Sequence, residues 1–132
     1  MYVNSVEEAL KVKEAMVITS IEDALKAVRK DGHNLRFVPK EFQTDEMCLI
    51  AVRQAGLALK YVENQTDELC LEAVKQDGWA LHFVYDQTEE MCLIAVKQDG
   101  YILQYVKKST PKVIQAALLQ DPDAFKYVKL CM

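Results

Sequence analysis

The chain repeats itself every 22 residues, and this period constrains its fold more than any other feature. Near copies of one phrase begin at four evenly spaced threonines: Thr44, Thr66, Thr88 and Thr110. A related copy begins at Ser20 and is longer because of an insertion around Pro39. A unit of this size cannot bury both of its faces alone, so neighbouring units must stack to make a core.

Each unit is predicted to form two helices. In the unit that begins at Thr66, apolar residues follow the threonine at helical spacing, and the acidic pair after it suits the start of a helix. All four glycines occupy one place in successive units, where we expect a left-handed turn: Gly32, Gly56, Gly78 and Gly100. The last unit has Pro122 at this place, so there we expect Asp121 to cap the second helix.

The resulting prediction is an all-α protein, an α-solenoid of five short helix-turn-helix repeats of 22–24 residues. Residues 1–19, which resemble only the first half of a unit, are predicted to form an N-terminal capping helix. The repeats are predicted to form one continuous domain with these units: 20–43, 44–65, 66–87, 88–109 and 110–132.

Composition narrows the class of protein. With 51% apolar and 27% charged residues, the 132-residue chain can bury a core without disulfides or metals. The net charge of −4 argues against direct nucleic-acid binding. The longest apolar runs are too short to cross a membrane, and the first 20 residues do not resemble a signal peptide. We therefore expect the protein to lie in the cytoplasm of a bacterium. If it is a viral or secreted effector, we expect it in a host cell.

The phrase Thr-acidic-acidic-apolar-Cys-Leu-x-Ala-Val-Lys-Gln-Asp-Gly-x-Ala-Leu-x-Tyr-Val resembles the tandem repeats of domain-of-unknown-function family 4116 over residues 20–132. The first unit departs from it at Ala24, and the last at Ile114 and Pro122. The resemblance implies a helical repeat found in bacterial and large-virus proteins, with no agreed activity and no catalytic residues to transfer.

No residue pattern indicates an enzyme, and no cofactor or metal is expected. Cys48, Cys70 and Cys92 recur with the repeat rather than at zinc-site spacing, so we interpret them as buried structural thiols, whereas Cys131 is expected to be exposed and reactive. Every Ser and Thr lies at or beside a predicted helix start, and neither histidine has an evident partner for nucleophilic catalysis.

Variable positions after the glycine predict a binding surface. They should face outward together, and the candidate partner-binding residues are Leu57, Lys60, Trp79, His82, Tyr101 and Gln104. Burial of Trp79 and Tyr101 between units is the competing interpretation. The aromatic residues that precede valine are expected in the core rather than in a base-stacking platform: Phe37, Tyr61, Phe83, Tyr105 and Tyr127.

A second candidate surface is an acidic ridge, formed by the pairs at the starts of the first helices: Asp45, Glu46, Asp67, Glu68, Glu89 and Glu90. Compensation of the helix dipole explains these pairs, but they could also dock on a basic partner. We therefore predict a non-catalytic protein-protein interaction module. The alternative is a phage or pathogen effector that inhibits a nucleic-acid- or nucleotide-handling host enzyme through the acidic ridge, and an engineered repeat scaffold ranks last.

Overall fold

The computed structural model describes residues 18–128, in which α-helices alternate with 3-10 helices and no β-strand occurs. The α-helices are α2 (Ile21–Lys30), α3 (Asp45–Gln54), α4 (Asp67–Gln76), α5 (Glu89–Gln98) and α6 (Pro111–Gln120). The 3-10 helices are η1 (Gly32–Phe37), η2 (Lys40–Phe42), η3 (Gly56–Tyr61), η4 (Gly78–Phe83), η5 (Gly100–Tyr105) and η6 (Pro122–Tyr127). The predicted capping helix at 1–19 falls almost wholly on residues 1–17, which lie outside the described range.

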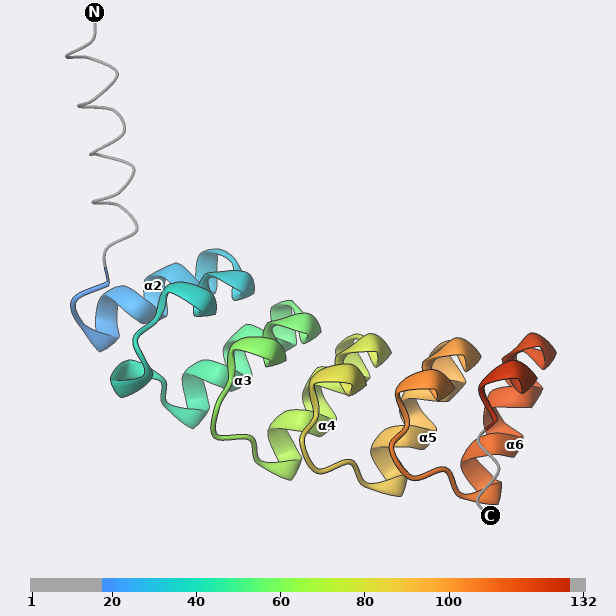
Figure 1. Ribbon diagram of the computed structural model, residues 1–132. Helices are drawn as coiled ribbons and strands as arrows, with labels where there is room; N and C mark the ends of the chain where they lie inside the picture. The colour runs from blue at the N-terminus through green and yellow to red at the C-terminus, as the bar shows by residue number, and fades with distance from the viewer. Residues whose placement is uncertain (1–17, 129–132) are drawn as a thin grey trace, which may run out of the picture.

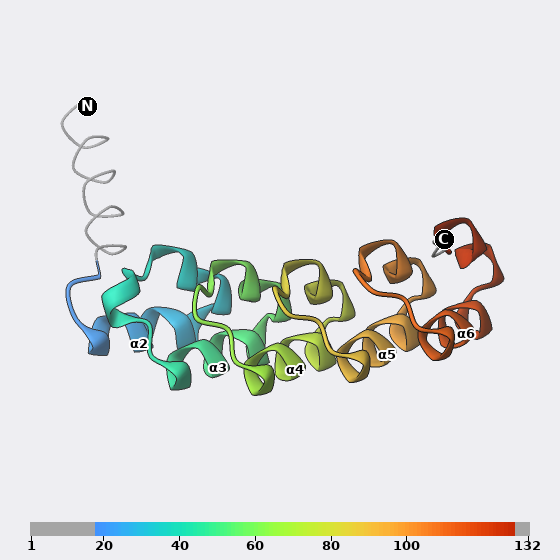
Figure 2. The same ribbon diagram turned by 60° about the horizontal axis from the view of Figure 1, so that its bottom comes forward.

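The helix pairs stack side by side in one row, with α2 and α6 at opposite ends (Figure 1). The α-helices form one layer and the 3-10 helices a second layer above it (Figure 2). Each α-helix contacts the next one, and the six-residue 3-10 helices also contact one another in order, η1 with η3, η3 with η4, η4 with η5 and η5 with η6. The predicted α-solenoid is therefore confirmed.

Side-chain caps define where the helices begin, as the sequence predicts. The Thr66 hydroxyl accepts a hydrogen bond from the backbone N–H of Leu69 at 3.2 Å, and the other units repeat this contact. In every unit except the second, where Ala55 takes this place, an aspartate then caps the 3-10 helix that starts at the glycine or at Pro122. In the last unit, Oδ1 of Asp121 accepts from the N–H of Asp123 at 2.9 Å. These side chains satisfy backbone donors that a helix start leaves free.

Each interior α-helix is covered on two sides. Four apolar residues of α5 are at most 3% exposed: Met91, Cys92, Ala95 and Val96. In α6 the equivalents of Met91 and Ala95, which are Val113 and Ala117, are also fully buried. The equivalents of Cys92 and Val96, which are Ile114 and Leu118, are only partly buried. The Met-Ala side therefore faces the preceding unit, and the Cys-Val side faces the following one.

The predicted left-handed turn at the glycines is wrong, because no glycine has a positive φ. Each glycine is instead the first residue of a 3-10 helix and lies against the next unit. A Cβ on Gly100 would lie 2.6 Å from the carbonyl oxygen of Ala117, and one on Gly56 would lie 2.5 Å from that of Ala73. Glycine is therefore needed for close approach between units, and the helix start expected only at Pro122 occurs in every unit.

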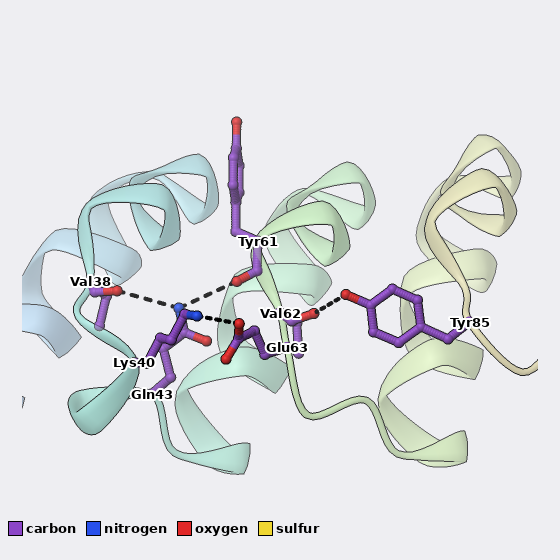
Figure 3. Close-up of polar contacts among 7 residues, drawn as sticks. All are labelled: Val38, Lys40, Gln43, Tyr61, Val62, Glu63 and Tyr85. Carbon is purple, nitrogen blue, oxygen red and sulfur yellow. Dashed lines mark hydrogen bonds and ion pairs between the residues drawn. The ribbon is translucent and has the colours of Figure 1, made fainter.

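Glutamine side chains hold neighbouring units together on two sides of the stack, because their amides bind backbone groups of the adjacent unit. One set, the loop glutamines, precedes the capping threonines: Gln43, Gln65 and Gln87. The Gln43 amide donates to the carbonyl oxygens of Val38 and Tyr61 at 3.3 Å each (Figure 3). These bonds tie one unit to the next through groups that the helices leave unpaired.

The second set, the helix glutamines, lies near the ends of the α-helices: Gln54, Gln76, Gln98 and Gln120. Oε1 of Gln98 accepts from the N–H of Gly78 at 2.7 Å, while its amide donates to the carbonyl oxygen of Val74 at 2.8 Å. The glycine therefore both permits the close approach and provides the donor that the next unit binds. The regular spacing of the η helices, on which the candidate site lies, depends on these contacts.

Candidate functional site

The outer surface of the 3-10 helices carries a row of mostly aromatic and cationic residues, which we call the aromatic strip. It comprises Leu57, Lys60, Tyr61, Trp79, His82, Phe83, Tyr101, Gln104, Tyr105, Lys126 and Tyr127. Of the predicted binding residues, Lys60 and His82 are exposed, whereas Leu57, Trp79, Tyr101 and Gln104 are half-buried. The structure therefore brings the predicted residues onto one surface.

The aromatic residues that precede valine lie at the edge of the core rather than inside it, and Tyr61, Phe83 and Tyr127 pack against its buried residues. Phe37 is 39% exposed, and Tyr61, Phe83, Tyr105 and Tyr127 are half-buried. Their rings lie at the joints between units: Tyr105, the equivalent of Phe83, contacts Trp79 and His82 of the preceding unit.

The centre of the strip is an aromatic cluster across one joint between units. The rings of Trp79 and Tyr105 meet edge to face, with centroids 5.6 Å apart. The Tyr105 ring also contacts His82, at 4.3 Å between centroids, and His82 contacts Phe83 at 5.0 Å. Trp79 therefore packs at a joint, as the competing interpretation expects, and yet remains partly accessible.

Similar contacts extend the strip toward the last unit. The Tyr101 ring meets the Tyr127 ring edge to face at 5.8 Å, and the Lys126 ammonium lies 5.0 Å from the centre of the Tyr101 ring. The Gln104 amide donates to the backbone oxygen of Tyr101 at 3.0 Å. At the other end of the strip, the Lys60 ammonium lies 5.0 Å from the centre of the Tyr61 ring. These distances are those of cation–π contacts, which hold both groups in place.

The acidic ridge lies along another edge of the solenoid. All six of its residues are exposed and occupy the first turns of α3, α4 and α5. α6 begins instead with Pro111 and Lys112, so the ridge does not extend to the last unit. Each acidic pair lies where the helix dipole favours negative charge.

The three repeated cysteines are buried beneath the loops between units. The Cys70 thiol donates to Oε1 of the loop glutamine Gln65 at 3.4 Å, and Cys92 contacts Gln87 in the same way at 3.7 Å. Burial, with a smaller contribution from the negative charge of Glu89, raises the pKa of Cys92 to about 11. The pKa values of Cys48 and Cys70 rise to about 11 for the same main reason.

These thiols are therefore expected to resist alkylation in the folded protein. With a pKa of about 11, roughly one thiol in a thousand is ionised near pH 8, and only the thiolate reacts quickly. In a Cys131→Ser variant, a thiol-reactive dye should label the native protein slowly and should label the unfolded protein completely. Rapid labelling of the native variant near pH 8 would contradict the structural role of Cys48, Cys70 and Cys92.

A hollow of about 410 Å³ lies over the N-terminal end of α5, away from the aromatic strip. Gln87, Cys92 and Lys107 contribute to its wall. The Lys107 ammonium already donates to the backbone oxygens of Val84 and Tyr85, at 3.1 and 2.8 Å.

Among residues 18–128, no three His, Cys, Asp or Glu residues gather as they would to hold a metal ion. Within the same range, every helix is too short or too polar to cross a bilayer.

Comparison with protein families gives one match. The sequence model of the family described as "Domain of unknown function (DUF4116)" matches three times, over residues 21–65, 66–110 and 88–130. The chain belongs to this family. Each match covers about two units, and the second and third overlap because they are offset by one unit of the DUF4116 array. No curated protein and no solved structure matches this DUF4116 chain.

Proposed function

We propose that this DUF4116 protein is a non-catalytic interaction module that binds another protein through the aromatic strip. One observation carries the proposal: Trp79, His82 and Tyr105 form a partly accessible cluster that spans two units. Tryptophan and tyrosine at the centre of a surface are the residues that most often dominate the energy of a protein interface. Extended surfaces of this kind are how repeat proteins bind their partners.

The contacts within the strip also favour binding energetically. Edge-to-face packing holds Trp79 on Tyr105 and Tyr101 on Tyr127, so these rings lose little freedom when a partner covers them. Trp79, Tyr101 and Tyr105, at the centre of the strip, carry no formal charge. The partner chemistry that fits this centre is therefore an apolar or aromatic segment. We place the interaction in the cytoplasm of a bacterium, or in a host cell if the chain is a viral or secreted effector.

The acidic ridge supports the alternative function, inhibition of a host enzyme that handles nucleic acids or nucleotides. Its observation is the row of exposed carboxylates along three neighbouring helices. Such a row could occupy a basic site that normally receives phosphates. We rank it second because helix capping and the helix dipole already explain the position of each acidic pair.

Replacement of Trp79 by alanine should weaken partner binding by about 2 kcal/mol, the effect of removing a central aromatic anchor. The partner is first identified by pull-down from native lysate with mass spectrometry, and affinities are then measured by calorimetry. Tyr85→Ala serves as a matched control, because Tyr85 is an exposed aromatic residue whose hydroxyl points to the Val62 carbonyl, outside the strip (Figure 3). Glu68→Gln tests the acidic ridge and should have little effect.

The thermal stability of each variant distinguishes binding from packing. If Trp79→Ala kept its affinity but unfolded at a much lower temperature, Trp79 would serve only to pack two units together. The partner surface would then have to be sought on the acidic ridge, where Glu68→Lys would abolish binding.

A further inference from the structure

Two neighbouring joints between units are built around the same kind of aromatic pair. At the first, which we call the tryptophan joint, the rings of Trp79 and Tyr105 meet edge to face with centroids 5.6 Å apart. At the next, the tyrosine joint, Tyr101 and Tyr127 meet in the same way at 5.8 Å. The members of the two pairs occupy the same positions of successive units, 22 residues apart. The two joints can therefore be compared residue by residue.

The joints differ in the cation that accompanies the rings. At the tyrosine joint the Lys126 ammonium lies 5.0 Å from the centre of the Tyr101 ring and 5.3 Å from that of the Tyr127 ring. The equivalent of Lys126 at the tryptophan joint is Gln104, whose amide is uncharged and donates to the backbone oxygen of Tyr101 at 3.0 Å. The tryptophan joint therefore has the aromatic pair without the lysine.

The other units show that Gln104 is the exception. The residue before the aromatic residue is basic in each of them: Arg36, Lys60, His82 and Lys126. His82 does contact the Tyr105 ring, but it comes from the unit of Trp79, so it is the equivalent of Gln104 at the tyrosine joint and not of Lys126. Within residues 18–128, no lysine or arginine side chain lies over the Trp79 or Tyr105 ring.

The rings of the tryptophan joint are suited to a cation from outside the chain. The face of an aromatic ring is electrically negative, and tryptophan attracts a cation more strongly than tyrosine or phenylalanine does. Trp79 and Tyr105 are both half-buried on the outer surface of the 3-10 helices, so part of each side chain remains accessible. Their edge-to-face contact also holds the rings in place before anything binds.

We infer that the Trp79–Tyr105 pair is a binding site for an arginine or lysine side chain, in the place that Lys126 takes at the tyrosine joint. The inference rests on the proposed function, because this side chain would belong to the segment that the aromatic strip binds. The methylene stem of such a side chain is apolar and packs with the apolar residues of that segment. An aromatic ring has no net charge, so this contact depends less on salt than an ion pair does.

Two peptides that differ in one charge test the inference: acetyl-Leu-Arg-Leu-amide and its analogue with citrulline, in which an uncharged urea group replaces the guanidinium. Trp79 is the only tryptophan of the chain, so its indole N–H gives a single signal in a nitrogen–proton NMR spectrum. The arginine peptide should shift this signal saturably at millimolar concentrations. The citrulline peptide should bind roughly 3- to 30-fold more weakly, the range expected for a cation–π contact.

A Gln104→Lys variant tests where the cation lies. Its ammonium should take the place that Lys126 has at the tyrosine joint, so the arginine peptide should bind this variant more weakly by a similar factor. Gln115→Lys is the matched control, because it adds the same charge at an exposed position of α6 outside the strip and should leave binding unchanged. Equal affinities for the two peptides, no saturable shift with the arginine peptide, or unchanged binding to Gln104→Lys would each overturn the inference.

The effect of Trp79→Ala on the captured partner separates this inference from the proposed function. If Trp79→Ala weakens partner binding while the two peptides bind wild type equally, the strip binds its partner without a cation and only the inference fails. If the arginine peptide binds more tightly but Trp79→Ala leaves the affinity for the partner intact, the pair does bind a cationic side chain and the proposed function fails.

Discussion

Gly100→Ala is expected to lower the free energy of unfolding by about 1–3 kcal/mol, the usual cost of forcing an extra carbon into a packed interior. The new Cβ would lie 2.6 Å from the carbonyl oxygen of Ala117 and 3.1 Å from Oε1 of Gln120. A backbone oxygen in a helix cannot move aside easily, so the joint between the last two units would have to open. Chemical denaturation of the full chain measures this effect.

Gly78→Ala is the matched control for this prediction. A Cβ on Gly78 would meet the Ala95 carbonyl oxygen at 3.2 Å, and its closest contacts are the ends of the Gln98 and Ile102 side chains, at 2.9 and 3.0 Å. Because side-chain ends adjust more readily than backbone, Gly78→Ala should cost less than Gly100→Ala. Equal and small losses in both variants would contradict the close-approach role of the glycines.

Gln87→Leu is expected to lower the free energy of unfolding by about 1–3 kcal/mol, because it removes three hydrogen bonds and leaves two partly buried backbone oxygens without this partner. The Gln87 amide donates to the carbonyl oxygens of Leu81 and Tyr105, at 3.2 and 2.9 Å, and its Oε1 accepts from the N–H of Lys107 at 2.9 Å. Leucine has a similar volume but can make none of these bonds. The joint that carries the Trp79 and Tyr105 contact would therefore loosen, and the aromatic cluster with it.

Denaturation and near-ultraviolet circular dichroism follow the two effects of Gln87→Leu, on stability and on the packing of Trp79. Gln115→Leu is the control, because Gln115 is an exposed residue of α6 and its replacement should change stability by a few tenths of a kcal/mol at most. If Gln87→Leu were as stable as Gln115→Leu, the loop glutamines would not hold the units together.

The repeat predicted the architecture because period, caps and apolar positions all agreed on stacked helix pairs. The glycines were misinterpreted because the sequence does not distinguish two kinds of glycine. One kind is needed for a positive φ, and the other is needed so that the next unit can approach closely. Pro122 was the informative exception, since proline tolerates a helix start and not a left-handed turn. The helix start at Pro122 has its equivalent at the glycine of every other unit.

The partial exposure of the aromatic residues could not be predicted for a different reason. These rings lie at joints between units, where Tyr105 contacts Trp79 and His82, and such contacts depend on how the units stack. The glutamines, in contrast, gave a signal that the sequence analysis missed. Gln65 and Gln87 recur at the repeat spacing, as do Gln76 and Gln98, and a long amide repeated in this way can bind the backbone of the adjacent unit.

The central claim, that the aromatic strip rather than the acidic ridge binds the partner, is tested most directly by the salt dependence of affinity. The Debye length, the distance over which salt screens charges, falls from about 10 Å at 0.1 M salt to about 3 Å at 1 M, so contacts between exposed charges weaken strongly. Burial of Trp79 and Tyr101 depends little on salt. Isothermal titration calorimetry with the captured partner should therefore give nearly equal affinities at about 0.1 and about 0.5 M salt. A steep loss of affinity, deepened by Glu68→Lys or Glu90→Lys, would contradict the account and assign binding to the acidic ridge.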